Sequence, residues 1–571
     1  MVSIKIILDY LSNYKSLSYL VLAISIIAAF LESLGLSLLI PITNEILLGD
    51  QPIQNKYIPS FTTYFNIKGS YYVLPLILIF IFFLKLILVG ANIYLTSFLG
   101  WSLRHHYASL LMSKYLNSEF KVVAKNQVGD LINSVLNETT RASQGIRYFT
   151  DFITKTILLI SLMLLLLISS FYFTLILFAS FIILALLLRK LISNFASEIG
   201  KKRVYLSKQH TEDSSQIIGS IKESKVLGLN DILISKFNIS VQSYSKINVI
   251  FNFFSSIPTH LAEFILVVAF GIVVMYIGYS SADINNSLPI FTLFFIVSAR
   301  IFQTASAMIN VRIKYLSYIE SINKVSDNVK TDYVQERNSG RKINEIKRNI
   351  EFKNVNFHYE KGFEILENIN LKIEMKKFVG IVGSSGSGKS TFINLITSLL
   401  SPTKGNIYID DENLNNINIS SLRKKISYVS QNPYLFNDTI FNNIKYGNMD
   451  ANKNEIIDAC KAAECFEFIQ NLPLKFETIV GDRGSLLSGG QLQRIAIARA
   501  ILRKPSLFIF DESTSSLDNL TEESIIRTIG SLAEKYSIIF ISHKKEILKH
   551  TDLVFEIKDK KIREIKLDQL N

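Results

Sequence analysis

A glycine-rich stretch, Gly383-Ser384-Ser385-Gly386-Ser387-Gly388-Lys389-Ser390, has the residue types and the spacing of a phosphate-binding loop. It follows an apolar segment, Phe378–Val382, that predicts a strand, and Thr391–Leu400 predicts a helix directly after it. Glycines let backbone N–H groups surround phosphate oxygens at a helix N-terminus, whose dipole favours anions. We expect Lys389 to reach the β- and γ-phosphates of ATP and the Ser390 hydroxyl to bind Mg²⁺. A glycine turn of purely structural use is disfavoured because both flanking elements are in place.

Two consecutive carboxylates, Asp511 and Glu512, end the apolar run Leu507–Phe510. An acidic residue at the end of such a strand binds the Mg²⁺ shell in phosphate-loop proteins, which is the role expected of Asp511. Glu512 lies beyond the strand end, where a carboxylate can orient and deprotonate a water molecule. By itself such a pair is more often an ordinary strand end, but the phosphate loop favours the catalytic interpretation.

A second possible anion cradle is the segment Leu487-Ser488-Gly489-Gly490-Gln491, which precedes a predicted helix over Gln493–Leu502. A Ser-Gly-Gly turn that opens a helix offers backbone N–H groups and a hydroxyl to an anion. A single chain does not need two anion-binding turns for one γ-phosphate. The two turns can act on the same phosphate if they come from opposite subunits. The pair of motifs therefore predicts a dimer.

With these three segments the chain resembles the ATP-binding cassette (ABC) family. The resemblance implies that Tyr359 stacks on adenine and that Gln431 contacts Mg²⁺ and the transmembrane domain. It also implies that Asp518 lies in a loop at the dimer interface and that His543 contacts the γ-phosphate. The implied catalytic residues are Glu512 and His543, the metal ligands are Ser390, Gln431 and Asp511, and the ATP-binding set also includes Thr391.

A lone Gln, Tyr or His is more often structural, but the order of these residues around the phosphate loop favours function. The segment Gly481-Asp482-Arg483-Gly484 is typical of exporters within the family. Ser513 and Lys544 stand where the family usually has Ala and Arg, and neither change removes a functional group. Both ATP sites of a homodimer should therefore hydrolyse ATP.

The composition separates a membrane half from a soluble half. Hydrophobic residues make up 49% of the 571 residues and charged residues 19%, whereas soluble chains carry about 25% charged residues. Long apolar runs alternate with short basic stretches up to about Tyr315. The net charge of +13 suits cytoplasmic loops rich in Lys and Arg, and no basic cluster interleaved with aromatic residues indicates nucleic acid. Cys460 and Cys465 suit a reducing cytosol.

Six membrane spans are expected from apolar runs long enough to cross a bilayer, which takes about 20 residues. The run Thr156–Leu188 would measure roughly 50 Å as one helix, so it predicts two spans with a turn near Ser169-Ser170. The other four spans are Leu17–Ile40, Tyr71–Leu99, Phe251–Tyr279 and Leu288–Ile309.

Orientation follows from the basic segments at Arg104–Arg147 and Arg189–Lys246, because an excess of Lys and Arg marks the cytoplasmic side. Helical spacing in Thr211–Gly228 predicts that spans continue as helices into the cytosol; solvated basic loops are the alternative. A short external helix is expected over Ile53–Tyr64. We expect a multi-pass protein of the cytoplasmic membrane with a cytosolic N-terminus, since the first apolar run is too long for a signal peptide.

The expected fold is a helical membrane domain of the ABC exporter type followed by an α/β phosphate-loop cassette. Its predicted boundaries are a transmembrane domain over 1–325, a polar linker over 326–347 and a nucleotide-binding domain over 348–571. The ATPase domain is expected in the cytosol.

Four ionisable residues fall inside predicted spans, namely Glu32, Lys85, Glu263 and Arg300. Such residues cost ~3 kcal/mol or more each in a bilayer and usually face a cavity or a partner. One interpretation is a translocation cavity in which Lys85 and Arg300 meet an anionic head group. The alternative is ion pairing between helices, and the sequence leaves both open.

The whole chain resembles the exporter half-transporter plan and is most similar to flippases of bacterial lipid-linked oligosaccharides. The similarity lies in Phe30-Leu31-Glu32-Ser33, Pro258, Glu263 and Arg300. It implies ATP-driven flipping of a lipid-linked oligosaccharide pyrophosphate by a homodimer in contact with membrane lipid. A drug or peptide exporter, or another lipid flippase, is the alternative. A fused ATPase disfavours an importer, and the apolar spans exclude a soluble ATPase that acts on nucleic acid or protein.

Overall fold

The structure is a computed structural model of the chain, and it divides into two compact units. One unit comprises Met1–Lys114 and Gln127–Asp332, and the other comprises Tyr115–Asn126 and Tyr333–Asn571. The predicted boundaries at 325 and 348 remain a prediction. The residues described are 11–12, 14–48, 70–124, 126, 128–169, 171, 198–199, 202–203, 205–280, 284–331, 334–336, 338–359, 362–511, 519–542 and 548–566.

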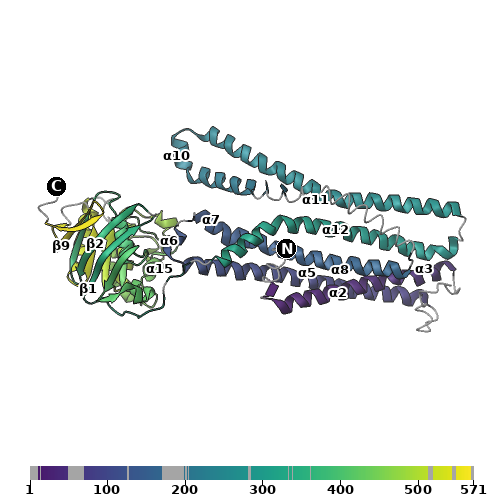
Figure 1. Cartoon of the computed structure of the whole chain (residues 1–571), viewed down its shortest axis with the longest axis horizontal. Helices are drawn as coiled ribbons and strands as arrows, with labels where there is room; N and C mark the ends of the chain where they lie inside the picture. The colour runs from purple at the N-terminus through teal and green to yellow at the C-terminus, as the bar shows by residue number, and fades with distance from the viewer. Residues whose placement is uncertain are drawn as a thin grey trace. The chain divides into compact units, whose positions relative to one another are not determined.

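The first unit is helical (Figure 1). Its described elements are α2 (Lys15–Ser37), α3 (Leu39–Leu48), α5 (Ser70–Leu116), α7 (Val128–Asn133), the π-helical turn η1 (Ser134–Glu138), α8 (Thr139–Ser169), α10 (Ile221–Val226), α11 (Asn230–Ser280) and α12 (Ile284–Lys330). α5 runs on to Leu116, just past the end of this unit at Lys114.

Within the part of the chain that the structure describes, four helical stretches are long and apolar enough to cross a membrane: Lys15–Thr43, Tyr72–Leu116, Val128–Ser169 and Thr292–Lys330. They overlap the predicted first, second, third and sixth spans, and the stretches over the second, third and sixth spans extend well beyond the predicted bounds. The predicted fifth span lies within α11, and the predicted fourth span and external helix lie largely or wholly outside the described residues.

The helices are longer than a bilayer requires. α11 has 51 residues and so measures ~75 Å, against ~30 Å of hydrocarbon. Residues 205–219 and 221–226 are also helical, which agrees with the predicted helical extension rather than with a solvated loop.

Small residues and short polar side chains join the membrane helices. A Cβ atom at Gly35 would lie 2.7 Å from the ring of Phe82, so α2 and α5 approach closely at this glycine. Asn92 of α5 donates to Ser25 Oγ of α2 at 2.6 Å, and the same hydroxyl lies 3.1 Å from Thr154 Oγ1 of α8. Close backbones and hydrogen bonds of this kind hold helices together where lipid removes the hydrophobic driving force.

The second unit contains two sheets. The six-stranded sheet has the order β10-β9-β3-β8-β7-β6, and all of its neighbouring strands are parallel except β10 and β9. Its strands are β3 (Phe378–Val382), β6 (Ile426–Val429), β7 (Leu507–Asp511), β8 (Ser537–Ile541), β9 (Leu553–Lys558) and β10 (Lys561–Ile565). The antiparallel sheet β2-β1-β4-β5 is formed by β1 (Asn349–His358), β2 (Glu364–Glu374), β4 (Lys404–Ile409) and β5 (Glu412–Asn413).

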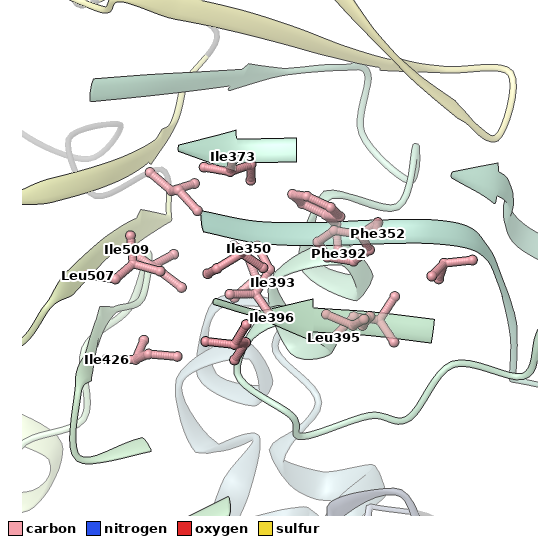
Figure 2. Packing of buried hydrophobic residues seen from close by; sticks show 14 of the residues in the cluster. Ile350, Phe352, Ile373, Phe392, Ile393, Leu395, Ile396, Ile426, Leu507 and Ile509 are labelled. Atoms are coloured by element: carbon pink, nitrogen blue, oxygen red, sulfur yellow. The ribbon is translucent and has the colours of Figure 1, made fainter. Parts of the chain in front are cut away.

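Helix α13 (Lys389–Ile396) packs into the core that the two sheets share (Figure 2). Phe392 of this helix is 1% exposed, and its ring centroid lies 5.0 Å from that of Phe352 in β1. Ile509 of β7 is part of the same buried cluster. Because α13 follows the phosphate loop directly, this packing fixes the position of the loop.

The other helical elements of this unit are α6 (Phe120–Val123), η2 (Leu414–Asn416), α14 (Ile419–Arg423), α15 (Ile440–Lys445), α16 (Lys453–Ala462), α17 (Phe466–Gln470), η3 (Lys475–Glu477), η4 (Asp482–Gly484), α18 (Gly489–Leu502) and α19 (Asn519–Ala533). Helices α15, α16, α17, α18 and α19 contribute to a second apolar cluster with the other face of the six-stranded sheet. Cys460 and Cys465 are buried in it as free thiols.

The short segment Tyr115–Asn126 belongs to the second unit although the sequence places it in a membrane-domain loop. Glu119 N donates to Val334 O at 2.9 Å, and Glu336 N donates to Asn117 O at 2.9 Å. This backbone pairing joins the loop to the predicted linker, and no side-chain pattern in the sequence indicates it.

Candidate nucleotide-binding site

The parallel strands bring the predicted nucleotide residues to one edge of the sheet. The phosphate loop follows β3, Asp511 ends β7, and Gln431 lies two residues after β6. Because β3, β8, β7 and β6 are neighbours and parallel, their carboxyl ends lie together. Ligands of open α/β sheets bind at this edge.

Glycines in the phosphate loop stand where a side chain would not fit. Gly388 has φ +108° and caps α13, and a Cβ atom there would lie 3.2 Å from the side chains of Ile365 and Leu366. At Gly383, with φ +155°, a Cβ atom would lie 2.6 Å from the Ile557 carbonyl oxygen. The loop therefore needs glycine at these positions to keep its shape.

The polar groups of the loop fit a phosphate ligand. Lys389 Nζ donates to the carbonyl oxygens of Gly383 at 2.7 Å and Ser384 at 3.1 Å, so the ammonium group lies against the loop. Ser387 Oγ is buried and has no hydrogen-bond partner among the described residues. A buried hydroxyl without a partner costs free energy, and a phosphate oxygen would satisfy it.

Tyr359 lies beside the start of α13. Its hydroxyl is 3.4 Å from Thr391 Oγ1, its ring packs edge-on against Phe357, and the residue is 46% exposed. An exposed aromatic face next to the phosphate loop fits the stacking role that the family resemblance implies.

The oxygen atoms of side chains near the loop are also suitable ligands for Mg²⁺. This cation prefers hard oxygen ligands and usually keeps waters and substrate phosphates in its shell. Ser390 and Asp511 supply a hydroxyl and a carboxylate, and Gln431 an amide oxygen. Among the described residues no group of three or more His, Cys, Asp or Glu side chains could hold a metal by itself.

One contact of Asp511 was not expected from the sequence. Tyr428 of β6 donates its hydroxyl to Asp511 Oδ2 at 2.9 Å. Partial removal from water and the negative charge of Asp511 raise the pKa of Tyr428 above its usual value near 10, so the hydroxyl stays protonated. The only sequence signal for this contact is the position of Tyr428 on the strand before Gln431.

The segment Leu487–Gln491, which we call the signature segment, caps the helix that follows it. Ser488 Oγ accepts a hydrogen bond from Gln491 N at 3.3 Å, and Gln491 Oε1 accepts one from Ser488 N at 3.1 Å, which forms a capping box at the start of α18. A Cβ atom at Gly489 would meet nothing within 4 Å, so this turn faces open space in the single chain.

Three predicted site residues, Glu512, Asp518 and His543, lie outside the described residues. The strands that precede them end at Asp511 and Ile541, at the edge of the sheet that carries the phosphate loop. Their roles remain predictions from the sequence.

The helical unit brings together three of the four predicted membrane charges. Glu32, whose side chain is 5% exposed, pairs with Lys85 Nζ at 3.1 Å and accepts a hydrogen bond from Arg300 Nε. Arg300 also donates to Gln303 Oε1 at 2.7 Å and is 38% exposed. Glu263 lies apart, with an exposed side chain next to His260. The ion pairing that the alternative interpretation predicted is therefore present, and the group formed by these three described residues carries two positive charges and one negative charge.

Comparisons with known proteins agree with both halves of the chain. The family of the ABC transporter transmembrane region matches residues 17–306, and the ABC transporter family matches residues 366–515. An ATP-dependent lipid A-core flippase of Legionella pneumophila is 30% identical over 441 residues, which cover 76% of this chain and 74% of that protein.

Other relatives match a smaller part of their own length. ABC transporter B family members 13, 14 and 24 of Arabidopsis thaliana are 31%, 41% and 41% identical, and the matches span 28%, 19% and 32% of those proteins. The solved structure of a bacterial Atm1-family ABC exporter with ATP bound is similar in fold, with a TM-score of 0.76 at 20% identity, over 97% of this chain and 94% of that one. The transmembrane family covers more than half of the sequence, so the chain belongs to the ABC transporter family and joins an exporter-type membrane region to an ATP-binding cassette.

Proposed function

We propose that this protein couples ATP hydrolysis to the export or flipping of an amphipathic, lipid-linked anion across the cytoplasmic membrane by alternating access. The observation that carries the proposal is the sheet edge where the phosphate loop, Asp511 and Gln431 meet, in a chain with long apolar helices. A phosphate-binding loop on this fold binds nucleotides, and the apolar helices of the same chain supply a membrane region whose transport step ATP hydrolysis can drive.

Different residues of the nucleotide unit are proposed to bind ATP, to hold Mg²⁺ and to catalyse hydrolysis. The loop backbone and Lys389 bind the phosphates, and Tyr359 stacks on the base. Bound Mg²⁺ would neutralise charge on the β- and γ-phosphates, held through Ser390, Asp511 and Gln431. Glu512 orients and deprotonates the attacking water, and His543 holds the γ-phosphate.

The working unit is proposed to be a homodimer. Each chain carries a phosphate loop whose shape its own residues maintain, and a signature turn whose Gly489 faces open space. A composite site forms if the signature turn of one copy covers the nucleotide on the loop of the other, with Asp518 at the interface. Every ATPase motif is intact, so both sites are equivalent.

The excess positive charge near Glu32 favours an anionic substrate. Glu32 can neutralise one of its two cations, Lys85 or Arg300, and the partly exposed guanidinium of Arg300 matches the planar arrangement of phosphate oxygens. The Legionella relative is named an ATP-dependent lipid A-core flippase. An oligosaccharide linked to lipid through pyrophosphate combines a lipid tail, an anion and a hydrophilic body.

The test is the stimulation of ATPase activity of the purified protein in lipid by a panel of lipid-linked glycans, other lipids, peptides and cationic dyes. We expect the pyrophosphate-linked glycans to stimulate, and Arg300→Ala to reduce that stimulation relative to its own basal rate. Arg312→Ala, an exposed arginine on the same helix, is the matched control. Stimulation by dyes or peptides alone would favour the drug or peptide exporter instead.

A further inference from the structure

The contact between Tyr428 and Asp511 crosses two adjacent strands. In the parallel pair of β6 and β7, Tyr428 is opposite Ile509 and Val429 is opposite Phe510. Asp511 is therefore two residues further along β7, on the face of the sheet that Tyr428 shares, where a long aromatic side chain reaches a diagonal neighbour. The hydroxyl does reach it, at 2.9 Å from Oδ2.

We propose that Tyr428 is a positioning residue that sets the orientation of Asp511 toward Mg²⁺. A hydrogen bond to Oδ2 restricts rotation of the carboxylate about its terminal torsion, which is otherwise broad. The donor is a neutral phenol, so it orients the carboxylate without cancelling the charge that the cation needs. Outer hydrogen bonds of this kind orient metal ligands and tune their affinity.

The same strand carries a second proposed metal ligand. β6 ends at Val429, and Gln431 follows two residues later. The hydroxyl of Tyr428 therefore ties the strand that leads to Gln431 to the carboxylate of Asp511. We infer that this bond keeps the two ligands in register with each other, so its loss would loosen the metal site rather than the adenine or phosphate contacts.

This inference rests on the proposed binding of ATP with Mg²⁺. The test distinguishes a failure of the inference from a failure of that proposed binding. ATP binding is titrated with Mg²⁺ in full-length protein that carries Glu512→Gln, so that turnover does not consume the nucleotide. We expect Tyr428→Phe to raise the Mg²⁺ concentration for half-maximal binding by roughly 10-fold, as for other outer hydrogen bonds to metal ligands. ATP binding in EDTA should not change.

The matched control is Tyr446→Phe. Tyr446 donates to Asp438 Oδ2 at 2.8 Å and is 41% exposed, against 46% for Tyr428, but its partner is no proposed metal ligand. Bound Mn²⁺, observed by electron paramagnetic resonance, gives a second readout, because a loosened site changes the line shape.

A shift in Mg²⁺ dependence that occurs in Tyr428→Phe and not in Tyr446→Phe supports the inference. Equal Mg²⁺ dependence in Tyr428→Phe and its parent, or the same shift in both variants, would overturn it while the proposed function stands. A parent protein whose ATP binding does not depend on Mg²⁺ at all would overturn the proposed metal site and this inference together.

Discussion

The motifs of the nucleotide unit and the buried charges of the helical unit find their partners at different distances along the chain. Within the phosphate loop Lys389 binds the carbonyl oxygens of Gly383 and Ser384, and within the segment Leu487–Gln491 Ser488 binds Gln491. In the helical unit Glu32 meets Lys85 of another helix and Arg300, which is 268 positions away in the sequence. The first kind of contact follows from local sequence, whereas the second depends on how helices pack.

The largest effect is expected where a local motif predicts chemistry directly. Glu512→Gln keeps the size of the side chain but cannot accept a proton, so ATP hydrolysis should fall by ~10² or more while ATP binding remains. Phosphate release and nucleotide binding of the purified protein measure the two effects separately.

Lys389→Ala provides the contrast, because loss of the phosphate counter-charge should weaken ATP binding as well as turnover. If the Glu512→Gln variant hydrolysed ATP as fast as the unmodified protein, Glu512 would not be the general base.

The difference between the units also explains what the sequence could predict. The phosphate loop and the strand that ends at Asp511 are short segments whose conformation depends on neighbours in the chain, so their placement was predictable. The helix predicted over Gln493–Leu502 begins earlier, at Gly489, because Ser488 caps it. The bond from Tyr428 was not predicted, because it needs the pairing of β6 with β7, strands that are far apart in the sequence.

Helix packing likewise determines which of the four predicted membrane charges pair with each other. The sequence indicated that Glu32, Glu263, Lys85 and Arg300 needed partners, but only the helix arrangement selects Glu32 as the shared anion and separates Glu263. The pairing of Glu119 with Val334 is also a backbone contact that leaves no pattern in the side chains.

The second prediction concerns stability in the helical unit. Glu32→Ala leaves Lys85 and Arg300 without their shared partner, and removal of one member of a buried ion pair costs ~3–5 kcal/mol. Arg300→Ala should cost less, because Glu32 and Lys85 still pair. Thermal unfolding of the protein in lipid, monitored as the loss of monodisperse protein, compares the variants.

Double variants sharpen this comparison. Glu32→Ala combined with Lys85→Ala removes one cation together with the anion and should recover part of the lost stability. Arg300→Ala combined with Glu263→Ala should behave as the sum of its single variants, since Glu263 lies apart. If the Glu32 and Arg300 double variant restored folding and transport together, the charges would be structural and the anionic-substrate proposal should be dropped.

The third prediction tests whether each ATP site combines two chains. Lys389→Ala chains and Ser488→Arg chains should each be inactive alone. Mixed dimers keep one intact composite site, so random mixing should restore roughly a quarter of normal activity if the sites act independently. The ATPase rate of co-reconstituted chains, with each variant alone as its control, measures the recovery; full activity of a purified monomer at high dilution would contradict the model.

The smallest effect is expected for an ion pair that is at least as short as the pair of Lys85 and Glu32 but is much more exposed. Lys504 Nζ lies 2.7 Å from Glu455 Oε1, with side chains 65% and 34% exposed, whereas the side chains of Lys85 and Glu32 are 14% and 5% exposed. Water and salt screen an exposed pair. We therefore expect Lys504→Ala to leave the unfolding temperature almost unchanged, and Lys85→Ala to lower it clearly.

The pH dependence of this pair gives the sign of its contribution. The hydrogen bond from Lys504, then that from Asn452 N, lowers the pKa of Glu455 below its usual 4.5. Because the folded pKa is the lower one, the contribution is fully present above pH ~4.5 and is lost as pH falls through the folded pKa. Unfolding temperatures of Lys504→Ala and the unmodified protein should therefore differ by the same small amount at pH 7 and at pH 5.5. A large difference at pH 7 that high salt does not reduce would show that exposure does not separate the two pairs.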